Sequence, residues 1–174
     1  MKLLETNRLI LRDWNEQDLN DLFIILSNPN IALPSDSSPI TTLCKCKNIL
    51  DYLIDMKNNY AIELKSTGHI IGTIGLNEDA KRNTDTRNLG FSLAEEFWNQ
   101  GIMTEALTVV IANAKSITKK LSATHKQNPK TEHILKKFGF QQVDVIHNIQ
   151  RRANEVPQAL RKILCKKEPK QIRK

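Results

Sequence analysis

The chain has 174 residues, of which 40% are hydrophobic, so it can bury the core of one domain and is not disordered throughout. No apolar run approaches the roughly 20 residues of a membrane span, and the first residues lack an apolar signal core, so we expect a cytoplasmic protein without membrane contact. The net charge of +7 lies in residues 151–174, which carry nine Lys or Arg against two Asp or Glu, and residues 1–150 are neutral.

The chain begins with a predicted strand and helix. Residues 9–14 form a largely apolar stretch typical of a strand. Asn15, with Asp18 three positions later, is typical of a helix cap, and apolar residues follow at helical spacing. Pro29 ends this helix.

A loop and a second helix come next. Residues 30–39 are rich in Pro, Ser and Asp, which predicts a loop. Thr41 or Thr42 can cap a helix whose apolar face carries Leu43, Cys46, Leu50, Leu53 and Ile54.

The middle of the chain predicts an antiparallel meander of three strands. Residues 60–64 and 70–76 flank a turn that contains Gly68, as in a β-hairpin. Residues 77–87 are polar and predict a loop, and residues 89–93 predict the third strand.

The remaining elements alternate between helix and strand. A helix over 104–117 is followed by a short strand at 121–124, a short helix at 131–137, and strands near 143–149 and 159–164. This order predicts an α+β fold with a mixed sheet flanked by helices.

Gln100 to Ala106 lies where a strand gives way to a helix. Unpaired amides at a helix N-terminus bind phosphate through hydrogen bonds and the helix dipole, and Gly101 would let the backbone approach a pyrophosphate. A tight turn is the simpler explanation of a lone glycine. Because no glycine neighbours Gly101 and no Lys-Ser or Lys-Thr follows it, the segment is neither a P-loop nor a dinucleotide fingerprint.

The three cysteines, Cys44, Cys46 and Cys165, predict neither a disulfide framework nor a metal site. Their number is odd, no export signal precedes them, and the closely spaced pair lacks the two further ligands of structural zinc. No base is evident beside them, so we expect no acetyl-cysteine intermediate.

Four separated segments resemble, in order, the GNAT N-acetyltransferases, and most of all the RimJ/RimL-like subgroup, which acetylates protein N-termini and assorted small amines. These segments are residues 4–12, 61–75, 89–106 and 128–140, within a resemblance that extends to about residue 148. It implies a GNAT-like, mainly antiparallel sheet of six to seven strands with a splayed central strand pair, and an enzyme that uses acetyl-CoA without a metal.

The resemblance also implies where acetyl-CoA binds. The family's pyrophosphate loop falls on residues 98–103, and the helix that follows adds one more amide. The implied loop residues are Trp98, Asn99, Gln100, Gly101, Ile102, Met103 and Thr104. The pantetheine arm would lie along Phe91, Ser92 and Leu93 and beside the Asn128 side chain. Met103 departs from the small residue that is usual at its position.

The family's usual catalytic acid is absent from this sequence. Leu135 stands where many members carry the tyrosine that protonates the leaving thiolate, whereas Thr131 occupies the position of the RimL-like hydroxyl. Asn88 replaces an acidic residue that often guides the proton from the amine. We therefore take Thr131 as the candidate for the thiolate proton.

Three residues are candidates for the base that accepts the proton of the amine. His125 has a reference pKa near 6.5, suited to proton transfer at neutral pH, but an ordinary loop histidine is an equal alternative. Glu105, in the first turn of a helix, more simply stabilises the helix dipole. Glu63 is the third candidate.

The predicted reaction is direct attack of a primary amine on the thioester of acetyl-CoA in a ternary complex. The subgroup points to a protein N-terminus, ribosomal proteins included. A polyamine, an antibiotic or a peptide toxin is the alternative acceptor, and a non-catalytic acyl-CoA-binding or RNA-docking module is the alternative function. The sequence leaves open whether the protein is a monomer or a homodimer.

The predicted domain spans residues 1–165 and is followed by a basic tail at 166–174. The basic C-terminal segment offers charge to phosphates, but it has no aromatic ring on which a base could stack. It therefore predicts weak contact with the ribosome or RNA, with a solubilising tail as the alternative.

Overall fold

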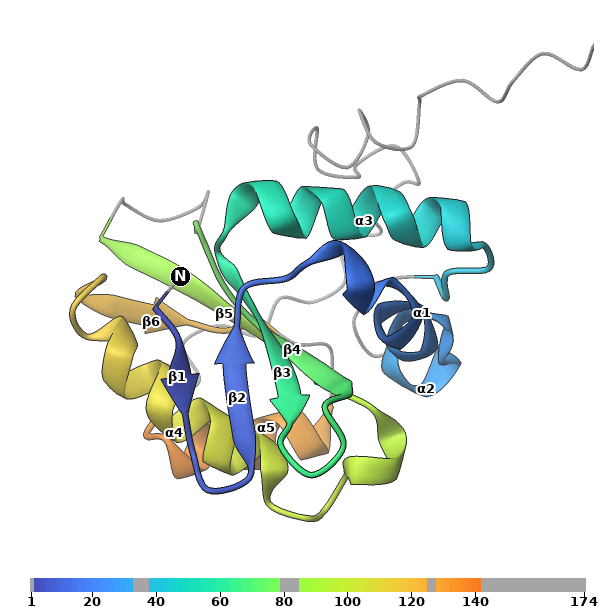
Figure 1. Ribbon diagram of the computed structural model, residues 1–174. Helices are drawn as coiled ribbons and strands as arrows, with labels where there is room; N and C mark the ends of the chain where they lie inside the picture. Colours follow the sequence, from blue (N-terminus) through green and yellow to red (C-terminus); the bar gives the residue numbers. More distant parts are fainter. Residues whose placement is uncertain (1, 33–37, 79–84, 125–127, 142–174) are drawn as a thin grey trace, which may run out of the picture. The chain divides into compact units, whose positions relative to one another are not determined.

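A mixed six-stranded sheet forms the centre of the fold (Figure 1). The computed structural model describes residues 2–32, 38–78, 85–124 and 128–141. The strands lie in chain order, antiparallel from β1 to β5, with β6 parallel to β5. They are β1 (Leu4–Glu5), β2 (Leu9–Arg12), β3 (Asn59–Leu64), β4 (Ile70–Glu78), β5 (Thr86–Leu93) and β6 (Lys120–Ser122).

Helices cover both faces of this sheet, with α1 and α3 on one face and α4 and α5 on the other (Figure 1). They are α1 (Leu19–Ser27), α2 (Pro29–Ala32), α3 (Leu43–Met56), α4 (Ile102–Ala114) and α5 (Pro129–Lys137), with short 3-10 turns η1 (Glu16–Asp18) and η3 (Glu95–Phe97). No helix in the described ranges is long and apolar enough to span a bilayer. The predicted α+β class, a mainly antiparallel sheet flanked by helices, is confirmed.

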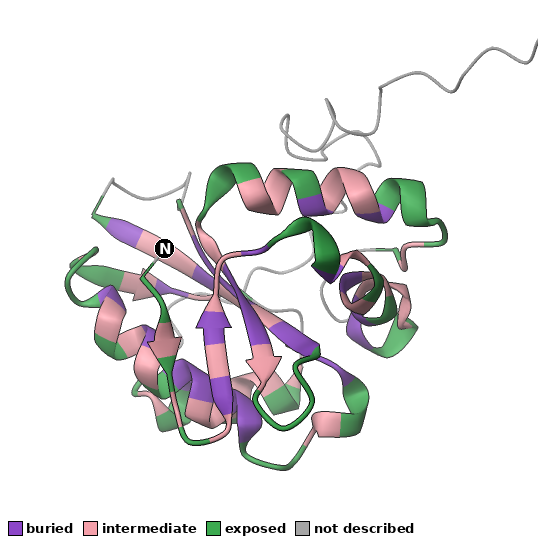
Figure 2. Cartoon of the chain, in the orientation of Figure 1, coloured by how far each residue is buried: buried purple, intermediate pink, exposed green. Residues whose placement is uncertain are grey.

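The core has two parts because side chains alternate between the faces of the sheet. Tyr60 and Ile62 of β3 pack with Leu107 of α4, whereas Ala61 between them packs with Leu22 of α1 and Leu50 of α3. Figure 2 shows buried residues along the strands and on the helix sides that face them.

The local signals read from the sequence are confirmed. Asn15 and Asp18 form a reciprocal capping box around η1, and the Thr42 hydroxyl accepts a hydrogen bond from the Lys45 amide at the start of α3. Gly68, in the β3–β4 turn, has a φ of 72°.

Three predictions about loops and strands differ from the structure. The strands extend into both ends of the loop expected at 77–87, because β4 reaches Glu78 and β5 begins at Thr86, with Arg87 Nη1 3.0 Å from Glu78 Oε1 across the ladder. The first helix, α1, ends at Ser27 before Pro29 as predicted, but the loop expected at 30–39 begins inside the short helix α2, because the Asn28 side chain accepts a hydrogen bond from the Asn30 amide. The strand β1 was not predicted.

Other boundaries shift by a few residues, and part of the prediction falls outside the described residues. The helix expected over 104–117 is α4, and the strand and helix expected at 121–124 and 131–137 are β6 and α5. The strands expected near 143–149 and 159–164, and the domain boundary at residue 165, lie outside the described residues.

The parallel pair β5–β6 diverges soon after it begins. Its pairing runs from Thr86 with Lys120 to Asn88 with Ser122. β5 continues to Leu93, and no described strand lies beside this last part on the β6 side. Among the described residues, the last five residues of β5 therefore have a sheet neighbour on one edge only, as expected for a splayed pair.

Candidate active site

The N-terminus of α4 presents unpaired backbone amides. Gly101 is the N-cap, with a left-handed φ of 74°, and the first hydrogen bond of the helix runs from the Glu105 amide to the Gly101 carbonyl at 3.0 Å. The amides of residues 102–104 precede this bond, so they have no acceptor within the helix. Together with the positive end of the helix dipole, they can bind an anion such as pyrophosphate.

Met103 does not obstruct this end of the helix. Ile102 and Met103 are only 3% and 5% exposed, and both pack in the core between α4 and the sheet. The Met103 side chain, which is larger than the residue usual at this position, thus points into the core, and the Met103 backbone amide stays at the helix end. This accounts for the departure from a small residue.

Trp98 connects the loop before α4 to β5 and to α5. Its indole Nε1 donates a hydrogen bond to the Leu93 carbonyl at 2.8 Å, and the ammonium of Lys130 lies 4.0 Å from its ring centroid. Asn99, next along the loop, has a left-handed φ of 60°, and Gln100 Nε2 donates to the Glu96 carbonyl. Side-chain contacts therefore fix the path of the loop.

The backbone N–H and C=O groups of successive residues in β5 point alternately toward β4 and toward the β6 side. The Ala94 amide donates to the Ile71 carbonyl of β4, so Ala94 and Ser92 turn their backbone groups toward β4. Phe91 and Leu93 turn theirs the other way, where β6 has ended. Since the Leu93 carbonyl already accepts the Trp98 indole, the amides of Phe91 and Leu93 are the donors on this open edge.

Asn128 and Thr131 lie together at the N-terminus of α5. The Asn128 Oδ1 accepts hydrogen bonds from the amides of Lys130, at 3.1 Å, and Thr131, at 3.2 Å, so Asn128 is the N-cap. The oxygen of the Asn128 side chain therefore caps α5, and its amide nitrogen is not the atom used for the cap. His125 lies outside the described residues.

The two candidate carboxylates are both held by arginines. Burial opposes ionisation of Glu105, but hydrogen bonds from Thr6 and Arg8 outweigh it and lower the pKa of Glu105. Glu63 accepts a hydrogen bond from Arg12 Nε at 2.6 Å. Each carboxylate therefore has a structural partner, which makes it a poor candidate for the base.

The two positions that depart from the family's catalytic pattern have structural roles. Asn88 Nδ2 donates to the hydroxyls of Ser122 and Thr124, at 3.2 and 3.4 Å, and so joins β5 to the β6 segment where their pairing ends. Leu135 is buried in the core beneath α5.

Glu95 is a candidate site residue that the sequence interpretation did not include. It lies two residues after the end of β5, and its carboxylate accepts hydrogen bonds from Asn28 Nδ2 at 3.0 Å and from Asn30 Nδ2 at 2.9 Å. The bonds from Asn30 and Asn28 lower the pKa of Glu95. Only its place two positions after the predicted strand could have indicated it.

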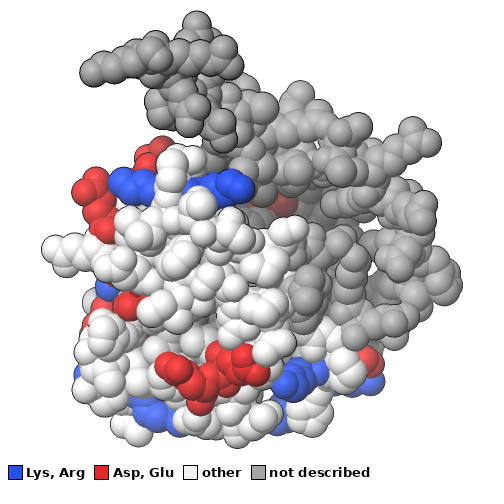
Figure 3. All heavy atoms as spheres, turned by 90° about the vertical axis from the view of Figure 1, so that its right-hand side faces the viewer, with Lys and Arg blue, Asp and Glu red and all other residues white. Residues whose placement is uncertain are grey.

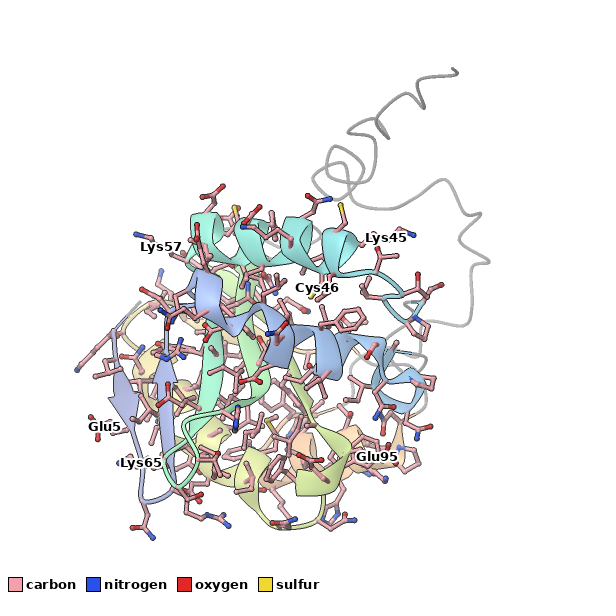
Figure 4. All side chains as sticks on the ribbon, turned by 45° about the vertical axis from the view of Figure 1, so that its right-hand side comes forward. Glu5, Lys45, Cys46, Lys57, Lys65 and Glu95 are labelled. Atoms are coloured by element: carbon pink, nitrogen blue, oxygen red, sulfur yellow. The ribbon has the colours of Figure 1, made fainter. Side chains whose placement is uncertain are left out.

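A pocket lies between this carboxylate and the α1–α2 corner. It is lined by Ile24, Asn28, Ile31, Ala94, Glu95 and Glu96. Figure 3 shows acidic side chains gathered on a largely uncharged part of this face, and Figure 4 shows Glu95 on η3, near α2. The pocket thus combines apolar walls with negative charge next to the C-terminal end of β5.

Comparisons with known proteins agree with this architecture. Residues 8–141 match the sequence profile of the acetyltransferase (GNAT) domain. A Bacillus subtilis protein named uncharacterized N-acetyltransferase YoaA is 24% identical over 152 residues, which cover 83% of this chain and 85% of the relative.

Solved structures share the fold at low sequence identity. A GNAT-family acetyltransferase from Bacillus anthracis has a TM-score of 0.71 and 15% identity, covering 80% of this chain and 84% of its own. The ribosomal-protein-S5-alanine acetyltransferase from Vibrio fischeri has a TM-score of 0.67 and 18% identity, with 81% and 84% covered. The profile match and the relatives show that the chain belongs to the GNAT acetyltransferase family and is an acetyl-CoA-dependent N-acetyltransferase.

Proposed function

We propose that the enzyme transfers the acetyl group directly to a primary amine while acetyl-CoA and the amine are bound together. The observation that carries this proposal is the open edge of β5, which leads through η3 and the Trp98 loop to the unpaired amides of α4. A cofactor with a pyrophosphate at one end and an amide-bearing arm at the other can satisfy both sets of groups.

The cofactor in this proposal lies with its pyrophosphate on the amides of residues 100–104 and its arm along residues 91–93. The amides of Phe91 and Leu93 then replace the missing strand contacts, and one of them polarises the thioester carbonyl as negative charge develops on its oxygen. The Nδ2 group of Asn128 donates to the arm while its Oδ1 caps α5.

The leaving thiolate is placed near Thr131. This residue is in the first turn of α5, where the positive end of the helix dipole favours a thiolate and the hydroxyl can supply a proton. His125 is the candidate that accepts the amine proton. Much of the rate then comes from holding the amine and the thioester in reacting geometry.

The acceptor amine enters, in this proposal, through the pocket beside Glu95. A protonated amine is attracted to an ionised carboxylate, and Glu95 is fixed by Asn28 and Asn30 next to the end of β5. We favour the N-terminus of a protein as the acceptor, because the Vibrio fischeri structural relative is named for a ribosomal protein. A polyamine or another small amine is the second candidate.

A panel of amines, with products identified by mass spectrometry, tests the reaction and the acceptor. The panel contains peptides that begin with Ser, Ala or Thr, the same peptides with blocked N-termini, spermidine and an aminoglycoside. Acetylation at the free N-terminus of a peptide supports the favoured acceptor, and acetylation of spermidine or the aminoglycoside alone supports the second. Coenzyme A release without any acetylated amine would contradict the proposal.

The Glu95→Gln variant tests the acceptor pocket separately. We expect the KM for the amine to rise, because the negative charge is lost while the hydrogen bonds to Asn28 and Asn30 can be kept in part. The affinity for acetyl-CoA should stay unchanged. An unchanged amine KM would show that the acceptor does not use this carboxylate.

A further inference from the structure

The carboxylate of Glu105, in the first turn of α4, is enclosed by donors from the turn between β1 and β2. Its Oε1 accepts the Thr6 hydroxyl at 2.6 Å and the Arg8 backbone amide at 3.0 Å. Its Oε2 lies 2.7 Å from both Arg8 Nε and Arg8 Nη2. All these donors come from segments nearly 100 residues away in the chain, so the contact joins the first strands to the start of α4.

Arg8 also contacts the loop on the other side of Gly101. Its Nη1 donates to the Gln100 carbonyl at 3.2 Å, while Nε and Nη2 bind Glu105. The guanidinium therefore bridges residues 100 and 105, and Nη2 would lie 3.8 Å from a Cβ atom placed on Gly101. The planar fork of arginine suits such a bridge, whereas the single ammonium of lysine does not.

This bridge is poorly explained as a source of stability alone. The side chain of Arg8 is 41% exposed, and ion pairs that water reaches contribute little to the free energy of unfolding. The bridge bears more directly on the backbone conformation of residues 99–101 than on the free energy of unfolding. Asn99 and Gly101, which both have left-handed φ values, flank Gln100, whose carbonyl accepts the hydrogen bond from Arg8.

We propose that Arg8 is a positioning residue of the acetyl-CoA site, which fixes residues 100–105 so that their amides converge on the pyrophosphate before the cofactor arrives. Thr6 and Glu105 complete the arrangement. The inference rests on the proposed placement of acetyl-CoA and adds a residue that does not itself touch the reacting atoms. A preorganised loop binds more tightly because less freedom is lost on binding.

The test compares Arg8→Ala and Arg8→Lys with Lys65→Ala as a matched control. Lys65 Nζ donates to Glu5 of β1 and to the Thr6 carbonyl in the turn that follows, and neither of these partners belongs to α4 (Figure 4). We expect Arg8→Ala to weaken acetyl-CoA binding in calorimetry by about tenfold, the size of a modest preorganisation effect. The KM for acetyl-CoA should rise in parallel, with the amine KM and kcat near wild type. Arg8→Lys should recover binding only in part, and Lys65→Ala should bind as wild type does.

Amide hydrogen exchange in the free enzyme provides a readout that does not depend on the cofactor. The amides of residues 101–105 should exchange faster in Arg8→Ala than in wild type, while amides of β3 and β4 keep their rates. If the wild type binds acetyl-CoA and Arg8→Ala binds equally well with unchanged exchange, the positioning role is wrong and the proposed function stands. If the wild type binds no acetyl-CoA, the proposed function fails and this inference fails with it.

Discussion

Gly101 shows how one residue sets the shape of the cofactor site. Its φ of 74° lies in the left-handed region, and an added Cβ atom would meet no heavy atom closer than 3.8 Å. The requirement for glycine is therefore conformational, and crowding within the protein is not its cause. A side chain at this position also stands where we place the approach of the pyrophosphate.

We predict that Gly101→Val destabilises the enzyme by roughly 1–2 kcal/mol, because a branched residue is strained in the left-handed region. It should also weaken acetyl-CoA binding. Gly101→Asn is the matched variant, since asparagine tolerates this conformation better, and it should keep most of the stability. Urea unfolding and calorimetry check the two effects, and wild-type affinity in folded Gly101→Val would count against the placement of the pyrophosphate.

The cysteines have no features of an acetyl-carrying nucleophile where the structure describes them. Burial raises the pKa of Cys46 to about 11, so this thiol stays protonated at neutral pH, and its sulfur lies 3.8 Å from the Leu19 carbonyl. Cys44 is exposed on α3, and Cys165 lies outside the described residues.

Replacing the three cysteines together, as Cys44→Ser, Cys46→Ala and Cys165→Ser, should leave turnover intact. The loss of the buried sulfur should lower the free energy of unfolding by about 1 kcal/mol, as for a typical core change. Initial-rate plots at several amine concentrations should intersect, as in a ternary-complex mechanism. Parallel lines would indicate a covalent intermediate and would overturn direct transfer.

At the scale of elements, the N-terminus of α5 combines helix capping with proposed cofactor binding. Asn128 uses Oδ1 for the cap, which leaves its Nδ2 group as the donor that we assign to the pantetheine arm. A serine at this position can also cap the helix, but it has no amide to donate and adds no charge.

We predict that Asn128→Ser stays within about 0.5 kcal/mol of wild type in stability, whereas Asn128→Ala loses about 1 kcal/mol with its cap. Both variants should bind acetyl-CoA more weakly, because both lack the amide donor. Thermal unfolding and calorimetry separate the two properties. Wild-type affinity in Asn128→Ser would reduce Asn128 to a cap.

Features that depend on residues close together in the chain were predictable from the sequence. The Asn15 capping box and the Thr42 cap are short-range signals, and the structure contains both. The extension of β4 and β5 was missed because pairing across the ladder makes strands of polar residues such as Asn77 and Arg87. Sequence patterns contain no information on such partners unless the register is known.

The same limit applies to the site. The order of strand, glycine and helix indicated where the α4 amides lie, since that arrangement is local. The contacts of Arg8 with Glu105 and of Glu95 with Asn28 join segments more than 60 residues apart, and no periodicity predicts them. Arrangements of this kind become visible only when the sheet brings its ends together.

At the scale of the whole molecule, the role of the excess positive charge is predicted from the sequence alone. Residues 166–174 carry five Lys or Arg against one Glu, and they lie outside the described residues. We propose that this tail adds a salt-dependent attraction to phosphate-rich partners and takes no part in the reaction.

Truncation after Cys165 should therefore spare the turnover of a small amine or short peptide and weaken ribosome association at low salt. Sedimentation with ribosomes over a range of salt concentrations checks this. Equal association of the truncated and full chains at every salt concentration would leave the tail a solubilising role. Loss of small-substrate turnover would instead place the segment in the fold or the site.

The placement of acetyl-CoA is the central claim of this account, and a two-dimensional amide NMR titration of the full chain with acetyl-CoA tests it most directly. We predict that the largest shifts fall on the amides of Phe91, Leu93 and residues 101–104, with smaller shifts at the start of α5. The amides of β1 and α3 should scarcely move. Saturable shifts concentrated on α3 or at the α1–α2 corner, with residues 91–104 unchanged, would contradict the account.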